Sequence, residues 1–248
     1  MNAVLTKHLG FDPANIVVLA EEDAYEPLMT KTLQPVNGPP TAERILTELI
    51  RLAEIANGDP TVTEVFIQYS GHGTYVLDTS QDEDDGHDEC LVPLDYQEKG
   101  CISDDQINSV LSLFPKRVTV IGLMDCCHSG TVWDLPKRYI SGNKFVIESQ
   151  ACKIKCKCLM ISGCEDDDVS MDAYNLNNAN EYSGAMSTSF MDGLRVYNYT
   201  IGVWQIMKHM HMFLKKRKLK QKPQVTTNVR LNRGTLLVNC SKTTPFIQ

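Results

Sequence analysis

Four short apolar runs constrain what this chain can fold into more than any other feature of its sequence. They are rich in β-branched residues, and they cover residues 15–20 (NIVVLA), 64–69 (EVFIQY), 117–124 (RVTVIGLM) and 157–162 (KCLMIS). Strands that are apolar on both faces occur mainly in sheets that are covered on both sides, which are mostly parallel. The sequence therefore predicts a buried, mostly parallel central sheet.

Helical patterns separate these runs. Residues 41–57 repeat apolar side chains at helical spacing, beginning at Thr41 and ending near Gly58 and Pro60. A second helix is predicted for residues 103–114, where Ser103 precedes an acidic first turn, and two more are predicted for 183–196 and 200–219. Alternating strands and helices are typical of an α/β fold in which helices cover a parallel sheet.

Composition limits the kinds of molecule that this chain is expected to bind. The net charge is −7 and the pI is about 5.4, so nonspecific binding to nucleic acid is not expected. No apolar run approaches the roughly 18 residues of a membrane-spanning helix, and the N-terminus lacks the pattern of a secretory signal. The nine cysteines are irregularly spaced and are predicted to be reduced thiols. We expect a cytoplasmic protein that binds neither membranes nor nucleic acid.

Two of the predicted strands end in chemically reactive residues. The second run leads into Ser70-Gly71-His72-Gly73, and the third leads into residues 125–130 (DCCHSG). Ligands of an open parallel sheet bind at the carboxyl ends of its strands, so a His and a Cys are expected to meet there. A Cys near a helix N-terminus has a lowered thiol pKa and is a better nucleophile. His72 by itself could be a strand-end histidine bonded to backbone, and the nearby Cys is what favours catalysis.

These segments resemble the two catalytic signatures of the metacaspases, cysteine peptidases with a caspase-like fold. Further segments match the family in order; they are 82–96 (DEDDGHDECLVPLDY), 100–108 (GCISDDQIN), 160–173 (MISGCEDDDVSMDA), 180–190 (NEYSGAMSTSF) and 221–227 (QKPQVTT). The resemblance implies a caspase-like three-layer α/β sandwich forming a single peptidase domain over residues 1–248. Residues 1–145 would correspond to the large subunit of caspases and residues 156–248 to the small subunit, in a monomeric protein.

The resemblance also implies roles for individual residues. Cys127 would be the nucleophile and His72 the acid or base, and the backbone N–H groups of Gly73 and Cys127 would form the oxyanion hole. Asp125 and Ser70 match positions in the family's substrate pocket, which accepts Arg or Lys before the cleaved bond. The implied activity is an endopeptidase that acts on protein or peptide substrates containing Arg or Lys.

Calcium is the cofactor that the resemblance implies. Asp88, Asp104, Asp105 and Asp134 match the four carboxylates that hold calcium in many family members, and oxygen ligands from several loops suit this cation. The whole segment 78–89 is expected to be a loop, in which Asp82, Asp84 and Asp85 are solvated.

The chain departs from the family pattern at its N-terminus. Residues 1–11 match the end of the helix that follows the family's first strand, so this strand and its pocket-lining loop are expected to be absent. Because the strand is central in the sheet, its loss would expose two strand edges. Two functions therefore remain open: a calcium-stimulated peptidase, or a catalytically impaired homologue or fragment acting as a binding or regulatory protein.

Overall fold

The computed structural model describes most of the 248 residues. The described residues are 1–21, 36–77, 87–126, 130–141, 144–147, 152–163, 184–219, 221–232, 234–235, 237 and 246–247. Their helices are α1 (Asn2–His8), the 3-10 helix η1 (Pro13–Asn15), α3 (Ala42–Gly58), α4 (Tyr96–Lys99), α5 (Asp104–Leu111), α6 (Ala185–Val196) and α7 (Val203–Lys216). Their strands are β1 (Ile16–Val17), β2 (Glu64–Ser70), β3 (Gly73–Leu77), β4 (His87–Leu91), β5 (Ile102–Ser103), β6 (Thr119–Asp125), β7 (Lys137–Ser141), β8 (Lys144–Ile147), β9 (Lys157–Ser162), β10 (Gln224–Thr227) and β11 (Phe246–Ile247).

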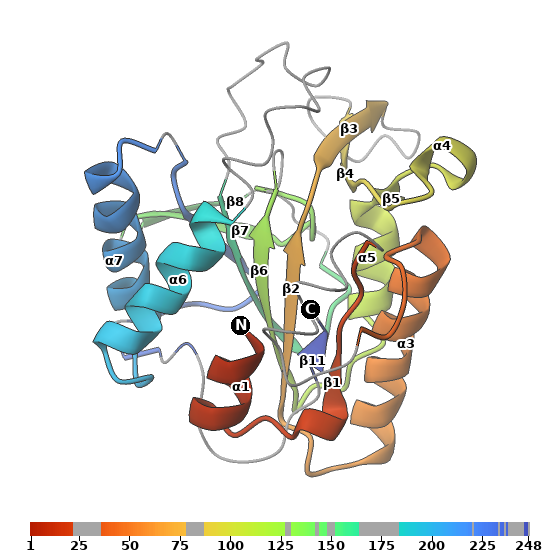
Figure 1. The fold of residues 1–248 in the computed structure, drawn as a ribbon, viewed down its shortest axis with the longest axis horizontal. Coiled ribbons are helices and arrows are strands. Elements are labelled where there is room, and N and C mark those ends of the chain that lie inside the picture. The colour runs from red at the N-terminus through yellow and green to blue at the C-terminus, as the bar shows by residue number, and fades with distance from the viewer. Residues whose placement is uncertain are drawn as a thin grey trace.

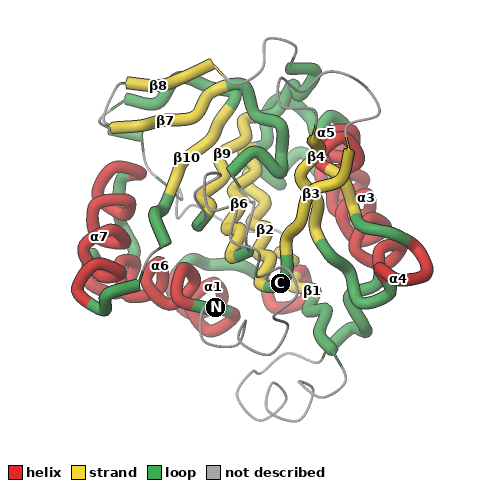
Figure 2. The backbone as a smooth tube through the Cα atoms, turned by 90° about the horizontal axis from the view of Figure 1, so that it is seen from above, coloured by secondary structure: helices red, strands yellow, loops and turns green. Residues whose placement is uncertain are grey.

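An eight-stranded sheet forms the centre of the structure, in the order β1-β11-β2-β6-β9-β10-β7-β8. The four pairings from β1 to β9 are parallel, and the three that follow are antiparallel. Figure 1 shows α1, α6 and α7 on one side of this sheet and α3 and α5 on the other, and Figure 2 shows the same layers from above. The predicted α/β sandwich with a mostly parallel central sheet is confirmed.

The two faces of β2 explain why its sequence is almost continuously apolar. Phe66 is fully buried against Phe190 of α6, with ring centroids 6.0 Å apart. Its neighbours Val65 and Ile67 belong to a second core cluster, which includes the apolar residues of α3 and α5. Successive side chains of a strand point to opposite faces, so each residue is buried under a different helical layer. Full burial of such a side chain contributes about 1.5–3 kcal/mol.

The four predicted strands are present as β1, β2, β6 and β9. The boundaries of β9 agree with the prediction, whereas β1 is shorter, because its continuation at Leu19 forms only an isolated bridge with Gly38. The predicted helix starts also hold: Thr41 accepts a hydrogen bond from the Arg44 N–H of α3, and Ser103 forms a capping box at α5. Local capping chemistry thus marked these helix ends correctly.

The expectation of two exposed strand edges is wrong at the level of β11. This strand lies between β1 and β2 and is parallel to both: Phe246 pairs with Ile16 and Phe66, and Ile247 pairs with Val17 and Ile67. Strand β11 comes from the distant end of the chain. Its backbone N–H and C=O groups pair with those of β1 and β2, which would otherwise lack partners there.

A second sheet carries part of the acidic segment. Strands β3, β4 and β5 form a three-stranded antiparallel sheet, and Val76 pairs with Asp88 in it. The prediction of a loop for the whole of residues 78–89 is therefore wrong for 87–89, which belong to β4, while 78–86 lie outside the described residues. The antiparallel partner strand overrides the low strand propensity of Asp and Glu.

Two further sequence expectations concern the cysteines and the possibility of a membrane-spanning helix. None of the described cysteines forms a disulfide bond; they are Cys90, Cys101, Cys126, Cys152, Cys156 and Cys158. Among the helices of the described residues, none has the length and apolar character needed to cross a membrane.

Candidate active site

The carboxyl ends of β2 and β6 lie side by side, as predicted. These strands are parallel neighbours in a register that pairs Ser70 with Asp125. The Gly71 N–H donates to the Asp125 carbonyl oxygen at 3.3 Å, which ties the turn after β2 to the turn after β6. The two sequence signatures therefore meet at one edge of the sheet.

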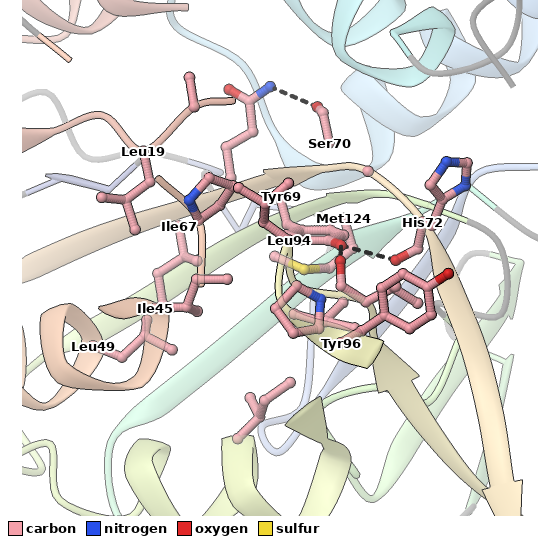
Figure 3. A pocket seen from close by; sticks show the side chains of 18 of the residues that line it. Leu19, Ile45, Leu49, Ile67, Tyr69, Ser70, His72, Leu94, Tyr96 and Met124 are labelled. Carbon is pink, nitrogen blue, oxygen red and sulfur yellow. Dashed lines mark hydrogen bonds between the residues drawn. The ribbon is translucent and has the colours of Figure 1, made fainter. Parts of the chain in front are cut away.

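His72 is exposed at this edge, in the turn between β2 and β3. Its carbonyl oxygen accepts hydrogen bonds from the Val92 N–H at 3.0 Å and from the Tyr69 hydroxyl at 2.8 Å. Figure 3 shows its imidazole pointing away from Tyr69. The turn is held through its backbone, and the ring extends from it toward solvent.

The other residues with proposed catalytic roles are only partly described. Cys127 lies outside the described residues, together with His128 and Ser129, whereas its neighbour Cys126 is buried. Gly73, the other oxyanion candidate, is the first residue of β3 and pairs with Leu91. The arrangement thus brings the His72 turn to the strand that leads into Cys127.

Among the predicted site residues that the structure describes, Asp125 is the most buried, with 1% of its surface exposed. Its Oδ2 accepts a hydrogen bond from the Ser187 N–H at 2.9 Å, and its Oδ1 accepts none of normal geometry from the described residues. Burial raises the pKa of Asp125, and the Ser187 backbone and side chain and the Gln221 side chain partly oppose this rise by favouring the charged form. A buried carboxylate oxygen with spare bonding capacity is suited to a cationic ligand.

Ser70 joins Asp125 through a polar network that sequence reasoning missed. The Ser70 hydroxyl lies 3.4 Å from the Ser187 hydroxyl, and the Gln68 amide donates to both, at 3.3 Å and 3.0 Å. Ser187 comes from the first turn of α6, which is distant in sequence. The available signal was Gln68, a polar residue inside an otherwise apolar strand, but its partner could not be inferred from the sequence.

An apolar cavity of about 580 Å³ lies beside β2, and its lining includes Gln68, Ser70 and His72 of the candidate site. Strand β2 contributes Ile67 and Tyr69 to its wall, α3 contributes Ile45 and Leu49, and Leu94 also lines it (Figure 3). The Tyr69 side chain therefore points away from the side of β2 on which Gln68 and Ser70 contact Ser187, as strand alternation requires.

The four predicted calcium ligands occupy neighbouring elements, but they do not converge on one point. Asp88 and Asp104 are buried, Asp105 is exposed, and Asp134 is partly buried. Asp134 Oδ2 accepts a hydrogen bond at 3.3 Å from Asn108, one helical turn beyond Asp104 on α5. Within the described part of the chain, no group of three or more His, Cys, Asp or Glu side chains is arranged to hold a metal ion.

Asp104 has the clearest features of a cation ligand. Its oxygens accept hydrogen bonds from the Asp105 N–H at 2.7 Å and the Glu89 N–H at 3.0 Å. Burial, together with the charges of Glu89 and Asp88, raises the pKa of Asp104 to about 8, although these two backbone hydrogen bonds lower it. Buried and mutually repelling carboxylates are the donor chemistry that a hard divalent cation would stabilise. Asp104 and Asp88 therefore fit calcium, whereas exposed Asp105 shows no such feature.

Comparisons with known proteins agree with these observations. A family profile described as metacaspase, peptidase C14 domain, matches residues 1–136. Metacaspase-3 of Trypanosoma brucei brucei is 30% identical over 241 residues, covering 92% of this chain and 64% of that protein. Inactive metacaspase-4 of the same organism is 31% identical over 237 residues, covering 90% and 63%, and metacaspase-1 of Arabidopsis thaliana is 30% identical over 204 residues, covering 78% and 52%.

A solved structure supports the fold. The crystal structure of protein GSU0716 from Geobacter sulfurreducens has a TM-score of 0.50 and 20% identity, and the match covers 91% of this chain and 95% of that one. The chain spans slightly less than two thirds of the length of the Trypanosoma relatives it matches. Because the family profile covers more than half of the 248 residues, the chain belongs to the metacaspase family.

Proposed function

We propose that this chain is a cysteine endopeptidase that cleaves after Arg or Lys and is stimulated by calcium. The observation that carries the proposal is the pairing of Ser70 with Asp125 at the carboxyl ends of adjacent parallel strands. It supports the approach of the His72 turn to the turn that contains Cys127. Family membership supports the same class of chemistry, since curated relatives over most of the chain are metacaspases.

The proposed reaction divides hydrolysis into two steps. The Cys127 thiolate attacks the carbonyl carbon of the cleaved bond, and His72 gives a proton to the departing amine, leaving an acyl-enzyme. Water then attacks the thioester while His72 accepts its proton, which releases the acid and restores the Cys127 thiolate and the protonated His72. The backbone N–H groups of Gly73 and Cys127 are the proposed donors to the oxyanion.

The proposed preference for Arg or Lys depends on Asp125. A guanidinium or ammonium group that enters this edge of the sheet would meet its buried carboxylate, whose Oδ1 has capacity for further hydrogen bonds. The hydroxyls of Ser70 and Ser187, 3.4 Å apart, offer additional acceptors beside it. An acidic side chain at the residue before the cleaved bond would instead be repelled by the charged carboxylate.

The proposed calcium site is centred on Asp104 and Asp88. Asp134 lies beside α5, where it accepts a hydrogen bond from Asn108. Calcium would neutralise the repulsion between these carboxylates. The hydrogen bond from Asn108 to Asp134 connects this cluster to the segment that follows Cys127. Calcium binding is therefore proposed to stimulate cleavage through this connection.

Hydrolysis of fluorogenic peptides tests the proposed function. We expect the wild-type chain to cleave after Arg but not after Asp, with a higher rate in calcium than in chelator, and we expect Cys127→Ala to be inactive. A folded wild-type chain that cleaves neither peptide would refute the peptidase and favour the second candidate, a binding or regulatory homologue. The second candidate has a specific motivation, because a relative with 31% identity is named an inactive metacaspase.

A further inference from the structure

Tyr69 is the one side chain that hydrogen-bonds the backbone of Gly71 or His72 within the described part of the chain. Its hydroxyl lies 2.8 Å from the His72 carbonyl oxygen and 3.0 Å from the Val92 carbonyl oxygen. The Val92 N–H also donates to the His72 carbonyl, at 3.0 Å. One phenol group therefore bridges the turn after β2 and the segment after β4.

The local sequence is suited to this bridge. The Tyr69 ring folds back beneath Gly71, and a Cβ atom at Gly71 would lie 2.8 Å from the Tyr69 hydroxyl oxygen. Such a separation is too short for a carbon–oxygen contact, so a larger residue at 71 would displace the ring. Gly71 thus allows Tyr69 to reach the backbone of a residue only three positions ahead.

Hydroxyl bonds and packing together hold the ring in place, since Tyr69 also packs against the core cluster that contains Val65 and Ile67. Tyr69 borders the cavity of about 580 Å³, so part of its surroundings is empty (Figure 3). Burial raises the pKa of Tyr69, so the phenol keeps its proton and remains a donor throughout the range in which proteins are stable. The bridge is consequently expected to persist across working pH values.

We propose that Tyr69 is a positioning residue for His72: it holds the backbone of the His72 turn, and with it the origin of the imidazole, at the carboxyl ends of β2 and β6. The proposal rests on the proposed function, because it assumes that His72 and Cys127 act as a pair. This role is distinct from recognition of the substrate by Asp125, because the Tyr69 hydroxyl contacts the His72 and Val92 carbonyls, whereas Gln68 and Ser70 contact Ser187.

The pH dependence of Cys127 alkylation tests this role without requiring peptidase activity. A cysteine paired with an imidazolium ion has a thiol pKa well below the ordinary value of about 8.5. Alkylation by iodoacetamide, followed at the Cys127 peptide by mass spectrometry, is expected to show such a lowered midpoint in the wild type. Tyr69→Phe is expected to move the midpoint toward 8.5, and Gly71→Ala, which displaces the ring but keeps the hydroxyl, is expected to act in the same direction.

Tyr96→Phe is the matched control for Tyr69→Phe in the alkylation measurement. Tyr96 lines the same cavity, but its hydroxyl contacts only the Gln97 amide, at 3.4 Å, among the residues that the structure describes. The same chemical change should therefore leave the midpoint unchanged. In peptide cleavage, Tyr69→Phe should reduce kcat by about ten- to a hundredfold with little change in KM, because misplacement of a reacting group costs rate. A merely structural role would lower the melting temperature without this division between kcat and KM.

Three results would overturn the positioning role: a Tyr69→Phe midpoint equal to the wild type, an equal shift in Tyr96→Phe, or a wild-type midpoint at the ordinary thiol value. A wild type that cleaves no peptide but shows a lowered midpoint, raised by Tyr69→Phe, would refute the proposed peptidase and support the positioning role.

Discussion

Asp125→Asn is expected to lower kcat/KM for an Arg substrate by about a hundredfold or more while the chain stays folded. Loss of one partner from a buried, hydrogen-bonded charge pair costs about 2–5 kcal/mol, and each 1.4 kcal/mol corresponds to a tenfold change. The asparagine side chain retains an oxygen that can accept the Ser187 N–H, at present 2.9 Å from Oδ2. The variant therefore removes the charge and leaves the hydrogen bond that joins β6 to α6.

The stability of this variant provides an independent check. Burial raises the pKa of Asp125, so the folded chain retains a proton that the unfolded chain releases above about pH 4. The folded state consequently loses stability as the pH rises from about 4 through the raised pKa, and Asp125→Asn should remove this loss. Chemical unfolding at several pH values measures the effect.

Asp192→Asn is the matched control for Asp125. Asp192 also lies on the α6 side of the sheet, but its carboxylate contacts His209 at 2.8 Å on the helical surface. Cleavage after Arg should be unaffected in this variant. Full activity of Asp125→Asn toward the Arg peptide would contradict the role of Asp125 in substrate recognition.

The second large effect is expected at Asp104, in the response to calcium. Its pKa is raised to about 8, whereas the unfolded carboxyl titrates near 4. Without calcium, the folded state binds the extra proton between these values, so its contribution to stability falls as the pH rises from about 4 to 8. Asp104→Asn should abolish this dependence, because an amide does not titrate in this range.

Calcium should stabilise the folded chain, whereas a chelator should remove this stabilisation. Ligand carboxylates must be deprotonated, so calcium affinity should increase up to about pH 8. At a concentration a hundred times its Kd, calcium would stabilise the wild type by about 2.7 kcal/mol, or about 5–10 °C in melting temperature. Asp104→Asn should lose this shift and the calcium stimulation of cleavage.

Asp105→Asn tests which carboxylates take part. Because Asp105 is exposed, its substitution should reduce the calcium-induced shift less than Asp104→Asn does. Differential scanning measurements with calcium and with chelator compare the variants directly. An undiminished calcium shift in Asp104→Asn would contradict the proposed site.

Patterns of burial explain which elements could be predicted from the sequence. Strands β2, β6 and β9 are covered by helices on both faces, so their burial appears directly as apolar runs. The hairpin β7–β8 lies at the edge of the sheet, where Lys137, Arg138 and Lys144 interrupt any apolar pattern. Strand β11 is only two residues long, and its position depends entirely on distant strands.

Some features of the candidate active site could likewise be predicted from the sequence, and others could not. The proximity of His72 and Asp125 followed from strand adjacency, which sequence signals can indicate. The roles of Ser187 and Tyr69 could not be predicted, because each depends on a tertiary contact: Ser187 is 62 residues from Asp125, and Val92 is 23 residues from Tyr69. The four predicted calcium ligands do not converge on one point in the described part of the chain, because their placement depends on loop geometry that residue spacing does not specify.

Covalent labelling of Cys127 tests the central claim most directly. A short peptide ending in an arginine acyloxymethyl ketone should modify this residue in the wild type, faster with calcium than with chelator, and much more slowly in His72→Ala. Cys126, the adjacent buried thiol, serves as an internal control because it should remain unmodified. Adduct mapped to Cys127 alone is the predicted result; no adduct on the folded chain, or adduct spread over other cysteines, would contradict the assignment of a Cys127 and His72 peptidase.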